Sequence, residues 1–158
     1  MITLHLVRHA HAVDAADDGD DAARPLSPKG REQVRRLGRF LREANAFQPE
    51  EIWHSPLVRA QESAVLLRRH LRLKTPLVLM PGLEPEDDPR AVARRLRTAT
   101  RSVAIVGHEP HLSALASLLV CERAAPPAFV MKKCAALTLE GTGRFWMVRW
   151  HVSPELLA

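Results

Sequence analysis

The sequence predicts an α/β fold: a three-layer α/β/α sandwich with a mostly parallel sheet and a C-terminal antiparallel hairpin. From the N-terminus to about residue 119, short apolar segments typical of strands alternate with amphipathic segments typical of helices. This alternation requires crossovers between parallel strands, with helices covering both faces of the sheet. Two further strand-like segments flank Gly141-Thr142-Gly143, a turn typical of a hairpin.

In the first third of the chain, residues 2–7 form an apolar strand that leads directly into Arg8-His9. Residues 10–26 are rich in aspartate and indicate a solvated loop. Ser27-Pro28 then marks the start of a helix, because serine caps the free N–H groups and proline suits the first helical position.

The middle and last thirds repeat this pattern. Ser55-Pro56 gives a second cap and first helical position, and we expect Ser55 to act as a cap rather than as a ligand. Segment 122–133 has no regular pattern. The other predicted elements are a strand at 51–54, a buried strand at 76–80, a loop at 81–89, a helix at 90–99, a buried strand at 102–106, a helix ending near 119, and strands at about 135–140 and 144–151.

The 158 residues, 46% of them apolar, fit one domain spanning 1–158. No apolar stretch approaches the roughly 18–20 residues that span a bilayer. The first ten residues lack the features of a signal peptide. Cys121 and Cys134 have no spacing typical of a disulfide framework or a zinc site, so we expect a reduced, cytoplasmic protein without a metal.

The net charge of +5 raises the question of a nucleic-acid partner. The arginines, however, lie mostly at helical spacing, as do Arg31, Arg35, Arg39 and Arg42, which is typical of a solvated helix face. The chain has no tyrosine and few other aromatic residues on which bases would stack. We therefore expect no nucleic-acid partner and no membrane partner, and an anionic substrate such as a phosphate instead.

Histidines and arginines follow three predicted strands. Arg8-His9 follows the first strand, Arg59 lies in the first turn of the helix after the second, and His108 follows strand 102–106. Ligands of α/β sheets bind at the carboxyl ends of the strands. Arginine offers paired donors to phosphoryl oxygens, and a neutral imidazole can attack phosphorus. We therefore expect these four side chains to surround a phosphoryl group.

These motifs, Leu6-Val7-Arg8-His9, Ser55-Pro56-x-x-Arg59-Ala60 and Val106-Gly107-His108, resemble the histidine phosphatase superfamily. The short length, together with Arg24-Pro25-Leu26-Ser27 and Leu83-x-Pro85, resembles the SixA-type phosphohistidine phosphatases. The resemblance implies that His9 is the phosphorylated nucleophile and that Arg8, Arg59 and protonated His108 bind phosphoryl oxygens. It implies no metal and no cofactor, and it puts Arg24 near the rim of the pocket as a substrate-binding residue.

The sequence departs from the family pattern at two points. Ala10 stands where the motif commonly has glycine. The second point is the general acid: Glu84, with Glu86 behind it, is the nearest candidate, and the alternative is a solvated acidic loop. An imidazole leaving group is readily protonated near neutral pH, whereas an alkoxide demands a placed acid. A chain with a weak acid should therefore prefer phosphohistidine.

Three functions follow as expectations. The first is a metal-independent phosphatase that hydrolyses phosphohistidine on a phosphorelay or phosphocarrier protein through phospho-His9. The second is a phosphatase of the same superfamily for a small-molecule phosphoester or polyphosphate. The third is a phosphate-binding interaction module without catalysis, which would have no need for an attacking imidazole.

Overall fold

The computed structural model describes residues 1–15 and 19–157 and shows a mixed α/β architecture around one six-stranded sheet. The chain runs in the order β1 (Ile2–Arg8), η1 (Asp21–Ala23), α1 (Pro28–Glu43), β2 (Glu51–His54), α2 (Val58–His70), β3 (Leu77–Leu79), α3 (Pro89–Arg97), β4 (Val103–Gly107), α4 (His111–Cys121), β5 (Ala136–Thr142), β6 (Phe145–Val152) and η2 (Pro154–Leu156). The predicted loop 10–26 includes residues 16–18, which lie outside the described residues.

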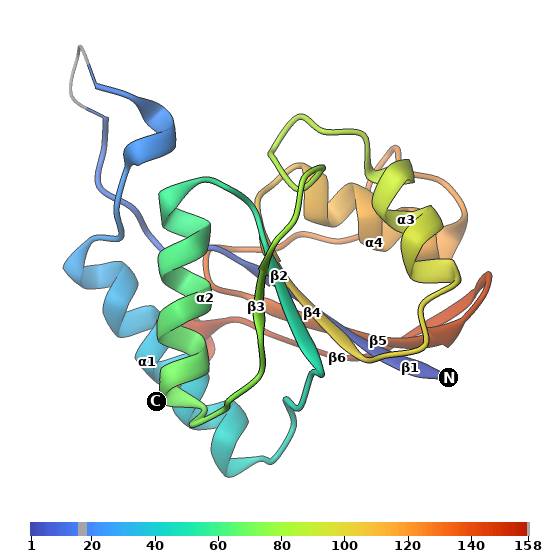
Figure 1. Cartoon of the computed structure of the whole chain (residues 1–158), viewed down its shortest axis with the longest axis horizontal. Helices are drawn as coiled ribbons and strands as arrows, with labels where there is room; N and C mark the ends of the chain where they lie inside the picture. The colour runs from blue at the N-terminus through green and yellow to red at the C-terminus, as the bar shows by residue number, and fades with distance from the viewer. Residues whose placement is uncertain (16–18, 158) are drawn as a thin grey trace.

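The sheet has the strand order β3-β2-β4-β1-β5-β6. Strands β3, β2, β4 and β1 pair in parallel, and the hairpin β5–β6 adds two antiparallel pairings at one side. Helices α1 and α2 lie on one side of the sheet, and α3 and α4 lie on the other (Figure 1). The predicted three-layer fold is confirmed.

Alternation along the central strands builds an apolar core on each face. In β1, Leu4 and Leu6 face α3 and α4 and pack with Ile105 and Leu115. Val7 belongs to the opposite core, which α1 and α2 complete. Because both faces of β1 and β4 are covered, the carboxyl ends of these strands are held rigidly side by side, and Arg8 pairs with Gly107 at that edge.

Two local predictions were wrong. Helix α2 begins at Val58 with Leu57 at its N-cap, so Ser55 does not cap it in the predicted way. Strand β3 is an edge strand, which leaves Leu79 exposed, whereas a buried strand was predicted. The predicted C-terminal hairpin is confirmed, and its turn lies at Gly143, where φ is +58°, while Gly141 lies within β5.

None of the helices in the described part of the chain combines the length and the apolar character needed to cross a bilayer.

Candidate active site

His9 is the first residue after β1 and is buried at the edge of the sheet. Its backbone N–H donates to Gly107 O at 2.9 Å, which ties it to the end of β4. Its Nδ1 lies 2.7 Å from Ala10 O, and since a carbonyl only accepts, Nδ1 carries the proton. The remaining ring nitrogen, Nε2, therefore holds the lone pair when the ring is neutral.

His108 is the first residue after β4, and only 1% of its surface is exposed. Its ring centroid lies 5.1 Å from that of His9. Its Nε2 lies 2.5 Å from Ser55 Oγ, and its Nδ1 is buried without a hydrogen-bond partner among the described residues. The structure therefore brings the two imidazoles together and fixes His108 through Ser55.

The two arginines reach this edge from different elements. Arg59, in the first turn of α2, is buried, and its Nη1 and Nη2 donate to Asp21 O at 3.1 Å and Asp21 Oδ2 at 3.4 Å. Arg8 is half-buried and its Nη1 donates to Met131 O at 3.0 Å. Each guanidinium is thus held by one loop of the site.

Burial and neighbouring positive charge keep both imidazoles neutral in the ligand-free protein. Burial, followed by Arg59, Arg8 and Lys133, lowers the pKa of His9 to about 4. Burial, followed by His9 and Arg59, lowers the pKa of His108 to about 3. Arg8 also lowers the pKa of His108, so both arginines act electrostatically on both histidines. The arrangement provides a neutral nucleophile surrounded by fixed positive charge.

The carboxylate of Asp21 lies between Arg24 and Arg59 and pairs with both. Arg24 Nη1 donates to Asp21 Oδ1 at 3.0 Å, and Arg24 Nε donates to Val13 O at 2.7 Å. The Arg24 side chain is mostly covered, and Asp21 bridges it to Arg59. In Figure 1 the blue turn η1, which carries Asp21, lies above the N-terminal end of α2.

The carboxylates near the site have other partners or face solvent. Glu84 and Glu86 are exposed, and the backbone N–H of Glu84 donates to Asp87 Oδ2 at 2.8 Å. Glu109 follows His108 and acts electrostatically on Arg8, but its carboxylate accepts from the backbone N–H and the hydroxyl of Ser113. Glu109 is therefore bound into the first turn of α4.

Ala10 fits the turn after the nucleophile without strain. It is fully buried, its φ is not positive, and its N–H donates to Ser63 Oγ at 3.0 Å. The departure from glycine therefore leaves the backbone at His9 in an ordinary conformation.

Sequence reasoning missed three residues of the site. Ser55 was expected to cap a helix, yet its hydroxyl contacts His108. Asp21 was one of many loop aspartates, and Lys133 was part of an irregular segment, yet Asp21 contacts Arg59 and Lys133 acts electrostatically on His9. The Ser55-Pro56 motif singled out Ser55, although as a helix cap and not as a contact of His108. No local pattern distinguished Asp21 or Lys133 from their neighbours.

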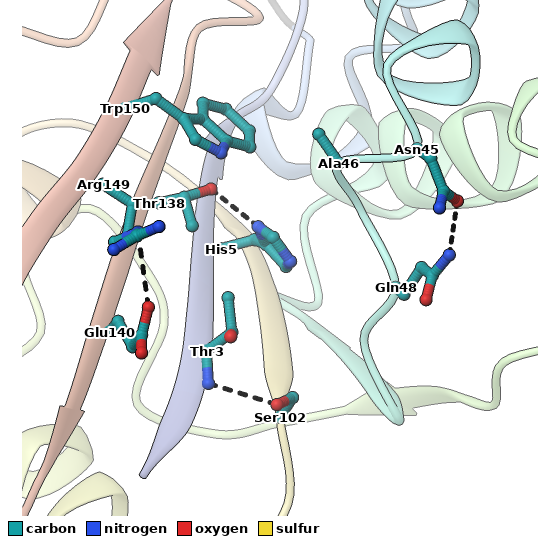
Figure 2. Close-up of a pocket in the computed structure, with 10 residues that line it drawn as sticks. All are labelled: Thr3, His5, Asn45, Ala46, Gln48, Ser102, Thr138, Glu140, Arg149 and Trp150. Carbon is teal, nitrogen blue, oxygen red and sulfur yellow. Dashed lines mark hydrogen bonds and ion pairs between the residues drawn. The ribbon is translucent and has the colours of Figure 1, made fainter.

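A polar hollow of about 390 Å³ lies beside His5, in the middle of β1 (Figure 2). Its polar groups largely pair with one another: His5 Nδ1 with Thr138 Oγ1 at 2.7 Å, and Thr3 N with Ser102 Oγ at 3.1 Å. None of the four predicted catalytic side chains lines it. The candidate active site is therefore the edge at His9 and His108.

Comparison with known proteins identifies the family of this chain. The family model described as "Histidine phosphatase superfamily (branch 1)" matches residues 4–85, which include Arg8, His9 and Arg59. A curated but uncharacterized protein of Picosynechococcus sp. (strain PCC 7002) is 31% identical over 113 residues, which cover 69% of this chain and 67% of that protein. The chain belongs to the histidine phosphatase superfamily.

Solved structures share the fold of this chain. The protein histidine phosphatase SixA complexed with tungstate superposes with a TM-score of 0.86 at 22% identity, over 97% of each chain. A putative alpha-ribazole-5'-P phosphatase of Escherichia coli K-12 superposes with a TM-score of 0.77 at 18% identity, over 98% of each chain. At these identities the likeness concerns the fold, which both kinds of phosphatase use.

Proposed function

We propose that this member of the superfamily hydrolyses phosphohistidine on a protein substrate through a covalent phospho-His9 intermediate, without a metal. The observation that carries the proposal is the pair of imidazoles with centroids 5.1 Å apart, both under the electrostatic influence of Arg8 and Arg59. This set offers one nucleophile and three cationic or proton-donating groups to a single tetrahedral anion.

In the first step, the lone pair on His9 Nε2 attacks phosphorus while the bond from phosphorus to the substrate imidazole breaks. The proton on His9 Nδ1, held by Ala10 O, keeps the lone pair on Nε2. The departing imidazole takes up a proton from solvent, or from His108 once the phosphoryl dianion beside its ring has raised the His108 pKa and protonated it. Arg8 and Arg59 bind the phosphoryl oxygens as their charge redistributes.

In the second step, water attacks the phosphorus of phospho-His9 and the bond to Nε2 breaks. Inorganic phosphate leaves, the water proton goes to solvent or to His108, and neutral His9 is restored. The low pKa of His9, about 4, favours this return to the neutral nucleophile at pH 7.

The surface beside the site supports a protein as the substrate. Arg8, Lys132 and Lys133 line a hollow of about 240 Å³ that shares Gln33 and the η2 segment with a neighbouring hollow lined by Lys29 and Arg36. Glu32 pairs with Arg36, and Glu155 pairs with Lys132, which leaves Arg8, Lys29 and Lys133 as the cations of this margin without a carboxylate partner among the described residues. This basic margin suits acidic side chains around a phosphohistidine on another protein.

The test is to trap the phosphoenzyme. Incubation with a phosphohistidine protein labelled with ³²P, followed by an alkaline quench, should leave acid-labile label on the wild-type chain. His9→Ala should carry no label and show no turnover, whereas His70→Ala, which changes a histidine on the far end of α2, should behave like the wild type. Label on His9→Ala would refute the proposed nucleophile.

The substrate class is tested by comparing kcat/KM for phosphohistidine with kcat/KM for alkyl phosphoesters, including a ribazole phosphate, because a putative alpha-ribazole-5'-P phosphatase shares the fold. We expect phosphohistidine to be preferred. A general acid contributes about 10²–10⁴-fold. Glu84 is exposed, so Glu84→Gln should change turnover of phosphohistidine far less than that. A preference for alkyl esters would favour the small-molecule alternative.

A further inference from the structure

Asp21 pairs with two arginines, Arg24 and Arg59, on one side of the site. Its Oδ1 lies 3.0 Å from Arg24 Nη1, its Oδ2 lies 3.4 Å from Arg59 Nη2, and its carbonyl oxygen accepts from Arg59 Nη1 at 3.1 Å. Asp21 thus presents Arg59 with two oxygen acceptors, of which one is charged. A phosphoryl group would offer oxygens of the same kind to the same guanidinium.

The two partners differ in their surroundings. The Arg59 side chain is 7% exposed, so its position is fixed by packing in α2. The Asp21 side chain is 64% exposed and lies on the three-residue turn η1. An incoming anion at Arg59 therefore meets a buried cation whose charged partner lies on the solvent-exposed side.

We propose that Asp21 is an internal counter-anion that the phosphoryl group of the substrate displaces from Arg59. The proposal rests on the proposed function only in that a phosphoryl oxygen binds at Arg59. In the ligand-free protein the Asp21 carboxylate neutralises part of the positive charge shared by Arg24 and Arg59. Every oxyanion that enters the site competes with it.

This competition selects for substrates with contacts beyond the phosphoryl group. Free phosphate has only its oxygens with which to displace Asp21, so the site holds it weakly and product leaves readily. A phosphohistidine on a protein gains further binding from the surface around it, such as the basic margin at Lys29 and Lys133. Asp21 therefore favours a macromolecular phosphoryl donor over free phosphate.

The experiment measures tungstate and inorganic phosphate binding by calorimetry in wild type, Asp21→Asn and Asp20→Asn. Removing the competing negative charge beside a bound dianion should tighten binding about tenfold at low salt. Half-molar salt should reduce this difference, because Asp21 is exposed. Asp20→Asn is the matched control: Asp20 accepts from Ala22 N in the same turn and, within the described residues, pairs with no arginine.

Tighter binding in Asp21→Asn alone supports the proposal. If the wild type binds the anion and Asp21→Asn binds it equally well, the proposal is overturned. Weaker binding by Asp21→Asn overturns it too, because Asp21 would then only orient the arginines. If the wild type binds neither anion, the anion site of the proposed function fails, which is a different result. Thermal unfolding of all three proteins confirms that each is folded.

Discussion

At the scale of single residues, the two histidines of the site are held in different ways. His9 is fixed through a backbone carbonyl, which sets its tautomer, whereas His108 is fixed through the hydroxyl of Ser55, which can donate or accept. The nucleophile thus has one defined state, and His108 is able to change its protonation. This difference matches the roles proposed for them.

We expect oxyanion binding to take up a proton at His108. Its pKa is about 3 without ligand, and a dianion beside the ring raises it, so the bound form is protonated at a pH where the free form is neutral. Calorimetric titration with tungstate at pH 7.5, in buffers of different ionisation enthalpy, measures the protons taken up. His108→Asn should abolish the buffer dependence. A wild type whose binding heat is the same in all buffers would contradict the assignment.

Ser55 is expected to position His108. Ser55→Ala leaves His108 Nε2 buried without its partner, which should cost about 1–3 kcal/mol of stability. Because the ring then loses its orientation, kcat should fall roughly tenfold or more with little change in KM.

Ser117→Ala is the control for Ser55→Ala, since Ser117 is equally buried and accepts from Ala128 N at 2.7 Å, away from the site. It should lower the unfolding free energy, measured in urea, without lowering kcat. Equal kcat values for the two variants would show that Ser55 has only a structural role.

At the scale of elements, the site depends on close contacts between backbones. Cys134 N donates to both Arg8 O and His9 O at 3.1 Å, so the segment before β5 forms one wall of the site. On the other side, α1 packs against the loop after His9, with Ser27 N donating to His11 O at 3.0 Å. Two elements far apart in sequence thus clamp the nucleophile loop.

The close approach of α1 to the loop after His9 requires a glycine at position 30. A Cβ at Gly30 would lie 2.0 Å from His11 O, a backbone atom that no side-chain rotation can move away. Alanine gains about 1 kcal/mol over glycine in a helix, but overpacking costs about 1–3 kcal/mol. We therefore expect Gly30→Ala to destabilise the protein in urea unfolding and to lower kcat/KM. Lys29→Ala, at the exposed neighbouring position, should be close to neutral in stability. A more stable Gly30→Ala would contradict the packing.

At the scale of the whole molecule, buried histidines link stability to pH, and three of them have strongly lowered pKa values. Burial lowers the pKa of His5 to about 4, and the values for His9 and His108 are about 4 and 3. In the unfolded chain each has a pKa of about 6.5. Between pH 6.5 and 4 the unfolded state therefore binds more protons than the folded state, so stability is retained above pH 6.5 and is lost as the pH falls.

The contribution of His5 is separable, because it lies in the hollow of Figure 2 rather than in the active site. Each such histidine adds a slope of up to about 1.4 kcal/mol per pH unit in this range. Urea unfolding between pH 4.5 and 7.5 should show a shallower slope for His5→Gln than for the wild type. A slope that His5→Gln leaves unchanged would mean that His5 is protonated in the folded protein.

The sequence alone determined the architecture, because strand alternation, helical periodicity and caps such as Ser27 are local properties. It also brought His9 and His108 to one edge of the sheet, since both directly follow parallel strands that proved to be neighbours. Contacts that depend on loop paths were decided only by the tertiary structure. No local pattern tells which aspartate of an acidic loop reaches Arg59, that Ser55 contacts an imidazole 53 residues away, or that β3 lies at an open edge, because each depends on atoms brought close by the packing of distant segments.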